Sequence, residues 1–155
     1  MQSNYIDSNL IAPCGMNCAI CSAFLAYKNK IFQKGHSITY CKGCRPRNKQ
    51  CAFLKKKCRD DLKLLKGEID YCFECNFYPC EKLIRIDERY KRDYKMSMIE
   101  NLELIKNEGL NKFIEKQYLK YKCKKCNELT SVHNKKCFVC EKINSLKNWI
   151  LINVG

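Results

Sequence analysis

The chain has 155 residues, 14 of them cysteine, and a formal net charge of +14. This length suits one domain, or one domain with a small appendage, and the cysteine content is far above ordinary usage. The first residues lack the basic segment and apolar run of a secretory leader, and no stretch approaches the roughly 18 apolar residues of a membrane span. We therefore expect a cytoplasmic protein without a membrane segment, in which cysteine pairs indicate metal ligands rather than disulfides.

The net charge depends on the state of the thiols, because metal ligands are thiolates. A zinc ion with four thiolates carries a net −2, so three such sites would lower the charge of the chain to about +8. The basic residues are mostly lysines spread along the chain. The charge is therefore compatible with an acidic partner such as nucleic acid, but a solvated surface is the favoured interpretation.

The first cysteine motif, CGMNCAIC, places Cys14, Cys18 and Cys21 at C-x3-C-x2-C spacing and leads into a helical segment, Cys18–Lys28. The same spacing holds an iron–sulfur cluster in radical enzymes. We exclude that class, because six βαβ-type units of about 30 residues each would exceed the whole chain and the alternating strand–helix pattern is missing. Zinc and a four-thiolate iron–sulfur cluster remain as interpretations.

Ten cysteines lie between residues 14 and 80, and we predict that most of them bind metal. One grouping, two knuckles across an insertion of roughly twenty residues, consists of Cys18, Cys21, Cys41 and Cys44. A second site would draw on Cys51, Cys58, Cys72, Cys75 and Cys80, with Cys14 as a further candidate. The alternative is a more complex cluster with bridging thiolates, because the sequence does not give the pairing.

Two short helices are expected among these cysteines. Asp60 is a candidate N-cap for a helix that carries Leu62, Leu64 and Leu65. Pro79 suits the first turn of a helix that runs through Leu83, Ile84 and Ile86. We expect the charged end of the second helix, residues 88–95, to be solvated.

A cysteine-free region with helical periodicity follows. Ser97 and Glu100 form a capping box, apolar residues then recur at Met98, Leu102 and Ile105, and Gly109 suits the C-cap. A second helix is predicted after it, with one face made by Leu110, Phe113, Ile114, Gln117, Tyr118 and Tyr121. Both are expected to be packing helices without a catalytic constellation.

The last four cysteines give the strongest signal. Cys123-x2-Cys126 and Cys137-x2-Cys140 are separated by ten residues, which suits two knuckles that complete a tetrahedral zinc site, with a short strand ELTSVH between them. A rubredoxin-like iron site is the alternative. Because all four ligands are sulfur, we expect a closed, structural site. His133 lies in the spacer and is interpreted as a strand side chain or a donor behind the ligands, not as a ligand.

The order of these motifs resembles a known family. The segments APCGMNCAIC, CKGCR, Cys51–Cys58 and YCFECNFYPCEKL resemble, in that order, the cysteine-rich domain of unknown function 3795. The following helical region and the terminal four cysteines resemble its longer members, so that the resemblance covers nearly the whole chain. Met16 stands where leucine is common in the family. The resemblance implies a metal-binding-like module and no established reaction.

We therefore predict a small metal-stabilised α+β protein with short helices, zinc knuckles, two packing helices and a C-terminal zinc ribbon. The predicted parts are a cysteine-rich module (residues 1–95), a helical connector (96–121) and the ribbon (122–155). We expect about three zinc ions, with an iron–sulfur cluster at the N-terminal cysteines as the alternative.

The sequence is compatible with three classes of function. The first is a binding or adaptor protein in which structural zinc adds on the order of 10 kcal/mol of folding free energy. The second is an iron–sulfur redox or sensing protein. The third is an enzyme with an open metal site, in which Cys14 or Cys80 would supply chemistry. The sequence favours the first, because it contains no Ser/His/Asp set, phosphate loop or H-E-x-x-H motif and only two histidines; His36 is expected in a solvated loop.

The basic residues around the last four cysteines raise the question of a partner. Lysines there alternate with aromatic residues, an arrangement that suits single-stranded nucleic acid. The aromatic residues are Tyr118, Tyr121, Phe138 and Trp149, and the lysines are Lys120, Lys122, Lys124, Lys125, Lys135, Lys136, Lys142 and Lys147. A protein partner is the alternative, because lysine gives no bidentate readout of bases.

Overall fold

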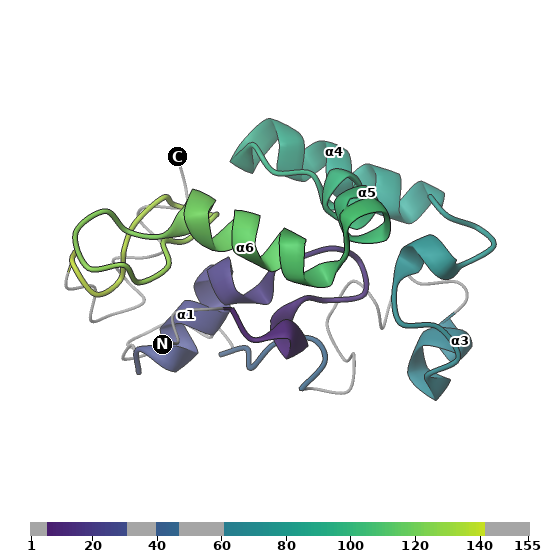
Figure 1. Ribbon diagram of the computed structural model, residues 1–155, viewed down its shortest axis with the longest axis horizontal. Coiled ribbons are helices and arrows are strands. Elements are labelled where there is room, and N and C mark those ends of the chain that lie inside the picture. Colours follow the sequence, from purple (N-terminus) through teal and green to yellow (C-terminus); the bar gives the residue numbers. More distant parts are fainter. Residues whose placement is uncertain (1–5, 31–39, 47–60, 142–155) are drawn as a thin grey trace.

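The computed structural model describes residues 6–30, 40–46 and 61–141. The short 3-10 helices are η1 (Ser8–Leu10), η2 (Cys18–Ile20) and η3 (Cys72–Glu74). The α-helices are α1 (Ser22–Lys28), α3 (Asp61–Lys66), α4 (Glu81–Tyr94), α5 (Met98–Glu108) and α6 (Leu110–Tyr121). Figure 1 shows α3 at one end of the molecule and the loops that follow α6 at the other. None of the helices in these residues has the length and apolar character needed to span a membrane.

The described residues are mostly helical and contain no strand, so the expected α+β class is not confirmed. The segment ELTSVH, expected as a strand, makes one isolated antiparallel bridge, Lys122↔Leu129, and then turns. The reason lies in its hydrogen bonds. Thr130 N donates to the carbonyl of Tyr121 at 2.8 Å, and Val132 N donates to that of Ile20 at 2.9 Å. These backbone groups therefore pair with a helix end and with the N-terminal segment instead of with a neighbouring strand.

The two predicted packing helices are confirmed. Ser97 Oγ accepts a hydrogen bond from Glu100 N at 3.0 Å at the start of α5, and Gly109 ends the helix with a φ of 93°. The buried side chains of α5 include Met98, Leu102 and Ile105. On α6 the buried side chains are Phe113, Ile114, Gln117 and Tyr121, as the sequence predicts.

A buried carboxylate joins α4 to α5. Asp87 on α4 is almost fully buried, and its Oδ1 accepts hydrogen bonds from Ser97 Oγ at 2.7 Å and from Ile99 N at 3.0 Å. Asp87 therefore satisfies a backbone donor at the start of α5 that no residue within that helix can reach. A negative charge at this end of α5 also agrees with the direction of its dipole.

Two boundaries differ from the prediction. The segment Cys18–Lys28 is not one helix, because Cys21 takes an extended conformation between η2 and α1. Helix α4 begins at Glu81 with Cys80 as its N-cap, so Pro79 precedes the N-cap instead of lying in the first turn. Asp60, the candidate cap of α3, lies outside the described residues, but Leu64 of α3 is buried as expected.

The first cysteine motif packs directly on α5. Gly15 has a φ of +90°, and a Cβ at this position would lie 2.4 Å from the carbonyl oxygen of Met98. Asn101 Nδ2 donates to the carbonyl of Gly15 at 2.9 Å. Cys14, Met16 and Cys18 belong to the same buried cluster as Leu102. Glycine suits position 15 for two reasons: its backbone has a positive φ, and α5 packs too closely to leave room for a side chain.

We predict that Gly15→Ala lowers the free energy of unfolding by about 2–4 kcal/mol, because the new Cβ adds a clash to the strain of a positive φ. Gly67→Ala is the matched control: Gly67 has a φ of +78°, and nothing lies within 4 Å of an added Cβ. It should cost only about 1 kcal/mol. Chemical denaturation of both variants at the same zinc concentration measures the difference, and equal losses would show that the contact with Met98 is unimportant.

Candidate metal centre

The sulfurs of Cys123, Cys126, Cys137 and Cys140 all lie within 4.8 Å of one another. Cys123 Sγ is 3.7 Å from Cys140 Sγ, and Cys126 Sγ is 3.6 Å from Cys137 Sγ. In a tetrahedral site with Zn–S bonds of about 2.3 Å, the sulfurs are about 3.8 Å apart. The four thiols can therefore hold one metal ion with little rearrangement.

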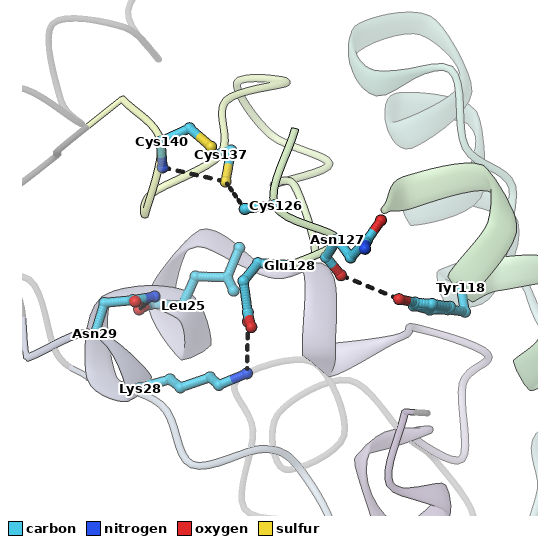
Figure 2. Close-up of polar contacts among 9 residues, drawn as sticks. All are labelled: Leu25, Lys28, Asn29, Tyr118, Cys126, Asn127, Glu128, Cys137 and Cys140. Atoms are coloured by element: carbon cyan, nitrogen blue, oxygen red, sulfur yellow. Dashed lines mark hydrogen bonds and ion pairs between the residues drawn. The ribbon is translucent and has the colours of Figure 1, made fainter. Parts of the chain in front are cut away.

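Local backbone geometry makes the first knuckle. Asn127 adopts the left-handed conformation with a φ of 65°, as expected for a residue just after a C-x2-C pair. Its N–H donates to the carbonyl of Cys123 at 2.9 Å, and Lys125 N–H donates to Cys123 Sγ at 3.4 Å. In the second knuckle Cys140 N–H donates to Cys137 Sγ at 3.4 Å, a contact drawn in Figure 2. These N–H groups stabilise thiolates at the positions where a cation would bind.

The thiols of the cluster differ in acidity. Hydrogen bonds from the backbone N–H groups of Cys126 and Lys125 lower the pKa of Cys123 to about 7. Contacts with the sulfurs of Cys126 and Cys123 raise the pKa of Cys140 to about 12. Burial raises the pKa of Cys137. Without a cation, the neighbouring sulfurs oppose one another's ionisation. A bound cation would remove this opposition, because it pairs with all four thiolates together.

Side chains from α6 and α1 contact the first knuckle. Tyr118 Oη donates to the carbonyl of Asn127 at 3.1 Å, and Lys28 Nζ lies 3.4 Å from Glu128 Oε1 (Figure 2). The ion pair is exposed and contributes little to stability. The tyrosine contact is more informative, since it fixes the knuckle against the last turn of the helix that leads into it.

His133 is not part of the cluster of four cysteines, and both of its ring nitrogens have other partners. Nδ1 accepts a hydrogen bond from Ser22 N at 3.2 Å, and Nε2 lies 3.0 Å from Tyr90 Oη. We assign the neutral tautomer with its proton on Nε2, because Nδ1 faces a donor. Burial lowers the pKa of His133 to about 4, with the charges of Lys135 and Arg89 acting in the same direction.

His133 belongs to a set of contacts between the loop that joins the two cysteine pairs and the N-terminal part of the chain. Val132 N donates to the carbonyl of Ile20 at 2.9 Å, and Ser131 Oγ lies 2.6 Å from Ser22 Oγ. We call residues 131–133 the docking loop. Sequence reasoning missed the roles of Ser22 and Tyr90, because no local pattern marks a hydrogen bond between residues as distant as 22 and 133.

The N-terminal cysteines are arranged less simply. Cys14, Cys18 and Cys44 are buried, while Cys21 is half-buried and has a pKa raised by burial and, to a smaller extent, by the nearby Cys41. No disulfide joins two of the described cysteines. Among the described residues, the C-terminal four form the one group of three or more possible ligands within 4.8 Å. Cys51 and Cys58 lie outside the described residues, so the grouping of the ten remains a prediction.

The surface around the centre carries lysines but few accessible rings. Tyr121 and Phe138 are buried in the structure, so neither presents a face to a nucleic acid base. Tyr118 is half-buried. The exposed lysines are Lys120, Lys122, Lys124, Lys125 and Lys135, while Lys136 is half-buried, and Lys142, Lys147 and Trp149 lie outside the described residues. The base-stacking surface suggested by the sequence is therefore largely absent from the described part of the chain.

The fold and the cysteine cluster define a small, mostly helical protein with a possible metal centre. Residues 10–85 match the family described as "Protein of unknown function (DUF3795)", so this part of the chain is similar to that family. The family resemblance of the cysteine motifs is thereby confirmed. The match ends before the C-terminal four cysteines, so their likeness to longer members remains a prediction. No curated protein and no solved structure matches the chain.

We predict that Cys126→Ser lowers bound metal by about one ion per chain, because a ligand of a four-sulfur site is lost. The amide of Val132 should then lose protection from hydrogen exchange, while that of Leu102 in α5 keeps it. The matched control is Val139→Ser, which changes an exposed residue between two of the cysteines. An unchanged metal content in Cys126→Ser would contradict the assignment of this site.

We also predict a pH effect from His133. Its folded-state pKa of about 4 lies below its unfolded value of about 6.5, so the unfolded chain takes up a proton first as the pH falls. The stability contributed by the neutral ring is therefore complete above about pH 6.5 and is lost progressively toward pH 4. His133→Ala should be less stable at neutral pH by about 1–3 kcal/mol, since Ser22 N–H loses its acceptor.

Denaturation of both proteins between pH 7 and 5 at a fixed metal concentration tests this. The thiols titrate in both proteins, so the difference between the two slopes isolates the histidine. The control is His36→Ala, which removes the other histidine of the chain and so matches the loss of one imidazole. A His133→Ala slope equal to that of the wild type would contradict the prediction.

Proposed function

We propose that this chain is a zinc-binding protein whose metal sites are structural and whose role is that of a binding or adaptor module. The observation that carries the proposal is the cluster of Cys123, Cys126, Cys137 and Cys140, with sulfurs 3.6 and 3.7 Å apart in two pairs. Four thiolates complete the coordination of Zn²⁺ and leave no position for a substrate. Such a site has a structural role, and in this chain it would stabilise the conformation of the docking loop.

The location of the docking loop supports a structural role for the metal. Residues 131–133 lie between the second and third cysteines of the cluster, so an ion that gathers the four sulfurs also closes this loop. The closed loop presents Val132 N to the carbonyl of Ile20 and Ser131 to Ser22. Metal binding at one end of the loop and docking at the other are thus parts of one folding event.

We extend the proposal to the N-terminal cysteines as further ligands, giving about three zinc ions in a chain that works in a reducing compartment such as the cytoplasm. Burial of Cys14, Cys18 and Cys44 beside the apolar core supports this, because metal-bound thiolates can be placed where free charge would be costly. An iron–sulfur cluster at these residues is the alternative. The partner of the module is a protein or a nucleic acid in this proposal, and the buried rings of Tyr121 and Phe138 weigh against nucleic acid.

Elemental analysis of anaerobically purified protein, combined with its absorption spectrum, tests the proposal. We expect close to three zinc ions per chain and no visible colour, since zinc has a filled d shell. Iron with acid-labile sulfide would support the redox or sensing function instead. A protein that folds fully with no bound metal under reducing conditions would contradict both functions.

A further inference from the structure

The contacts of the docking loop fall on both sides of one cysteine. Val132 N donates to the carbonyl of Ile20 at 2.9 Å, and Ser131 Oγ lies 2.6 Å from Ser22 Oγ. The residue between Ile20 and Ser22 is Cys21. In Figure 1 helix α1, which follows Cys21, lies at the same end of the molecule as the loops that follow α6. The docking loop therefore fixes the backbone immediately before and immediately after Cys21.

A third contact acts on the same segment. His133 Nδ1 accepts a hydrogen bond from Ser22 N at 3.2 Å, and its Nε2 lies 3.0 Å from Tyr90 Oη. Burial raises the pKa of Tyr90, and the charge of the nearby Cys21 acts in the same direction. The docking loop therefore contacts the backbone beside Cys21 and, through Tyr90, the surroundings of its side chain.

Cys21 also lies beside a second candidate ligand. Cys41 N donates to the carbonyl of Ala23 at 3.3 Å. Burial raises the pKa of Cys21, and the charge of Cys41 adds to this effect. Gly43 N–H donates to Cys41 Sγ at 3.4 Å, the same kind of contact as in the first C-terminal knuckle. The structure thus places together two cysteines that the sequence assigns to one metal site.

The other end of the docking loop leads directly into the C-terminal cluster. Ser131 N donates to the carbonyl of Lys136 at 2.9 Å, and Lys135 N donates to that of Ser131 at 2.9 Å. Lys136 precedes Cys137 in the chain, so the position of the loop depends on that of Cys137. An ion that gathers Cys137 with the other three sulfurs would therefore favour the loop conformation that contacts the Cys21 segment.

We propose that metal binding by the C-terminal four cysteines increases the zinc affinity of an N-terminal site that includes Cys21 and Cys41. The docking loop transmits the effect, because it restricts the backbone on both sides of Cys21. This restriction lowers the conformational entropy that is lost when Cys21 coordinates an ion. The coupling is reciprocal, so zinc at the N-terminal site also strengthens binding at the C-terminal four. This inference rests on the proposed zinc binding of the N-terminal cysteines.

Alkylation of the full-length protein in zinc buffers tests the coupling. A cysteine that binds zinc is protected from iodoacetamide, and peptide mass spectrometry gives the free zinc concentration at which Cys21 is half protected. We expect this concentration to rise at least about fivefold in Cys126→Ser, while saturating zinc still protects Cys21. Cys75 is the reference in the same samples and should keep its zinc dependence, because the loop contacts described above fall on residues 20, 22 and 90.

A variant of the loop tests the route while it keeps every cysteine. Ser131→Ala removes the hydroxyl that contacts Ser22 and should raise the half-protecting zinc concentration for Cys21 by about two- to tenfold. The C-terminal site should still fill at saturating zinc. Thr130→Ala is the matched control: it removes a hydroxyl from the neighbouring position, but that hydroxyl donates to the carbonyl of Tyr121. The zinc dependence of Cys21 should therefore stay as in the wild type.

The outcomes separate this inference from the proposed function. If the same zinc concentration protects Cys21 in the wild type and in Cys126→Ser, the coupling is wrong while the zinc-binding function stands. If zinc never protects Cys21 in the wild type, both the coupling and zinc binding at Cys21 fail. Loss of protection at saturating zinc in Cys126→Ser would show that the loop covers Cys21 without helping it bind metal. That result, an equal shift at Cys75, or an equal effect of Thr130→Ala and Ser131→Ala would overturn the coupling.

Discussion

The packing of the docking loop on the segment that joins η2 to α1 is the interaction on which the arrangement of this chain depends. The hydrogen bonds from Val132 N to Ile20 O and between Ser22 and Ser131 join parts of the chain more than 100 residues apart. They are buried, so each broken bond would leave an unsatisfied polar group in the interior. This contact turns two cysteine-rich segments, distant in sequence, into one packed body.

The same contact also supports the cysteine cluster, because it holds the loop between the two cysteine pairs. A knuckle without a core is folded by its ion alone, whereas here the loop between the cysteine pairs is also held by its neighbours. His133 illustrates the arrangement: its ring is removed from metal coordination and used as a polar bridge between Ser22 and Tyr90. An ion bound by the four sulfurs would thus stabilise the loop at one end, and the protein interior holds it at the other.

Features determined by local chemistry were predictable from the sequence. The cap at Ser97, the buried face of α6 and the left-handed Asn127 depend on residues within a few positions, and each is present. The strand at ELTSVH was not predictable, because its backbone groups bond to Tyr121 and Ile20, whose positions the tertiary fold decides. The roles of Ser22 and Tyr90 were missed for the same reason. The C-terminal group of four cysteines was predictable because its spacing is itself the signal, and the four sulfurs do lie close together.

The buried carboxylate of Asp87 fixes the position of α4 relative to α5. It sits near the middle of a helix about 21 Å long, at about 1.5 Å per residue, and its bonds to Ser97 and Ile99 fasten that middle to α5. One end of α4 borders a cavity whose lining residues include Cys72 and Cys75. The other end carries Tyr90 and Tyr94, which contact His133. Helix α4 therefore spans the distance between these two regions, and the hydrogen bonds of Asp87 fix it to α5 between them.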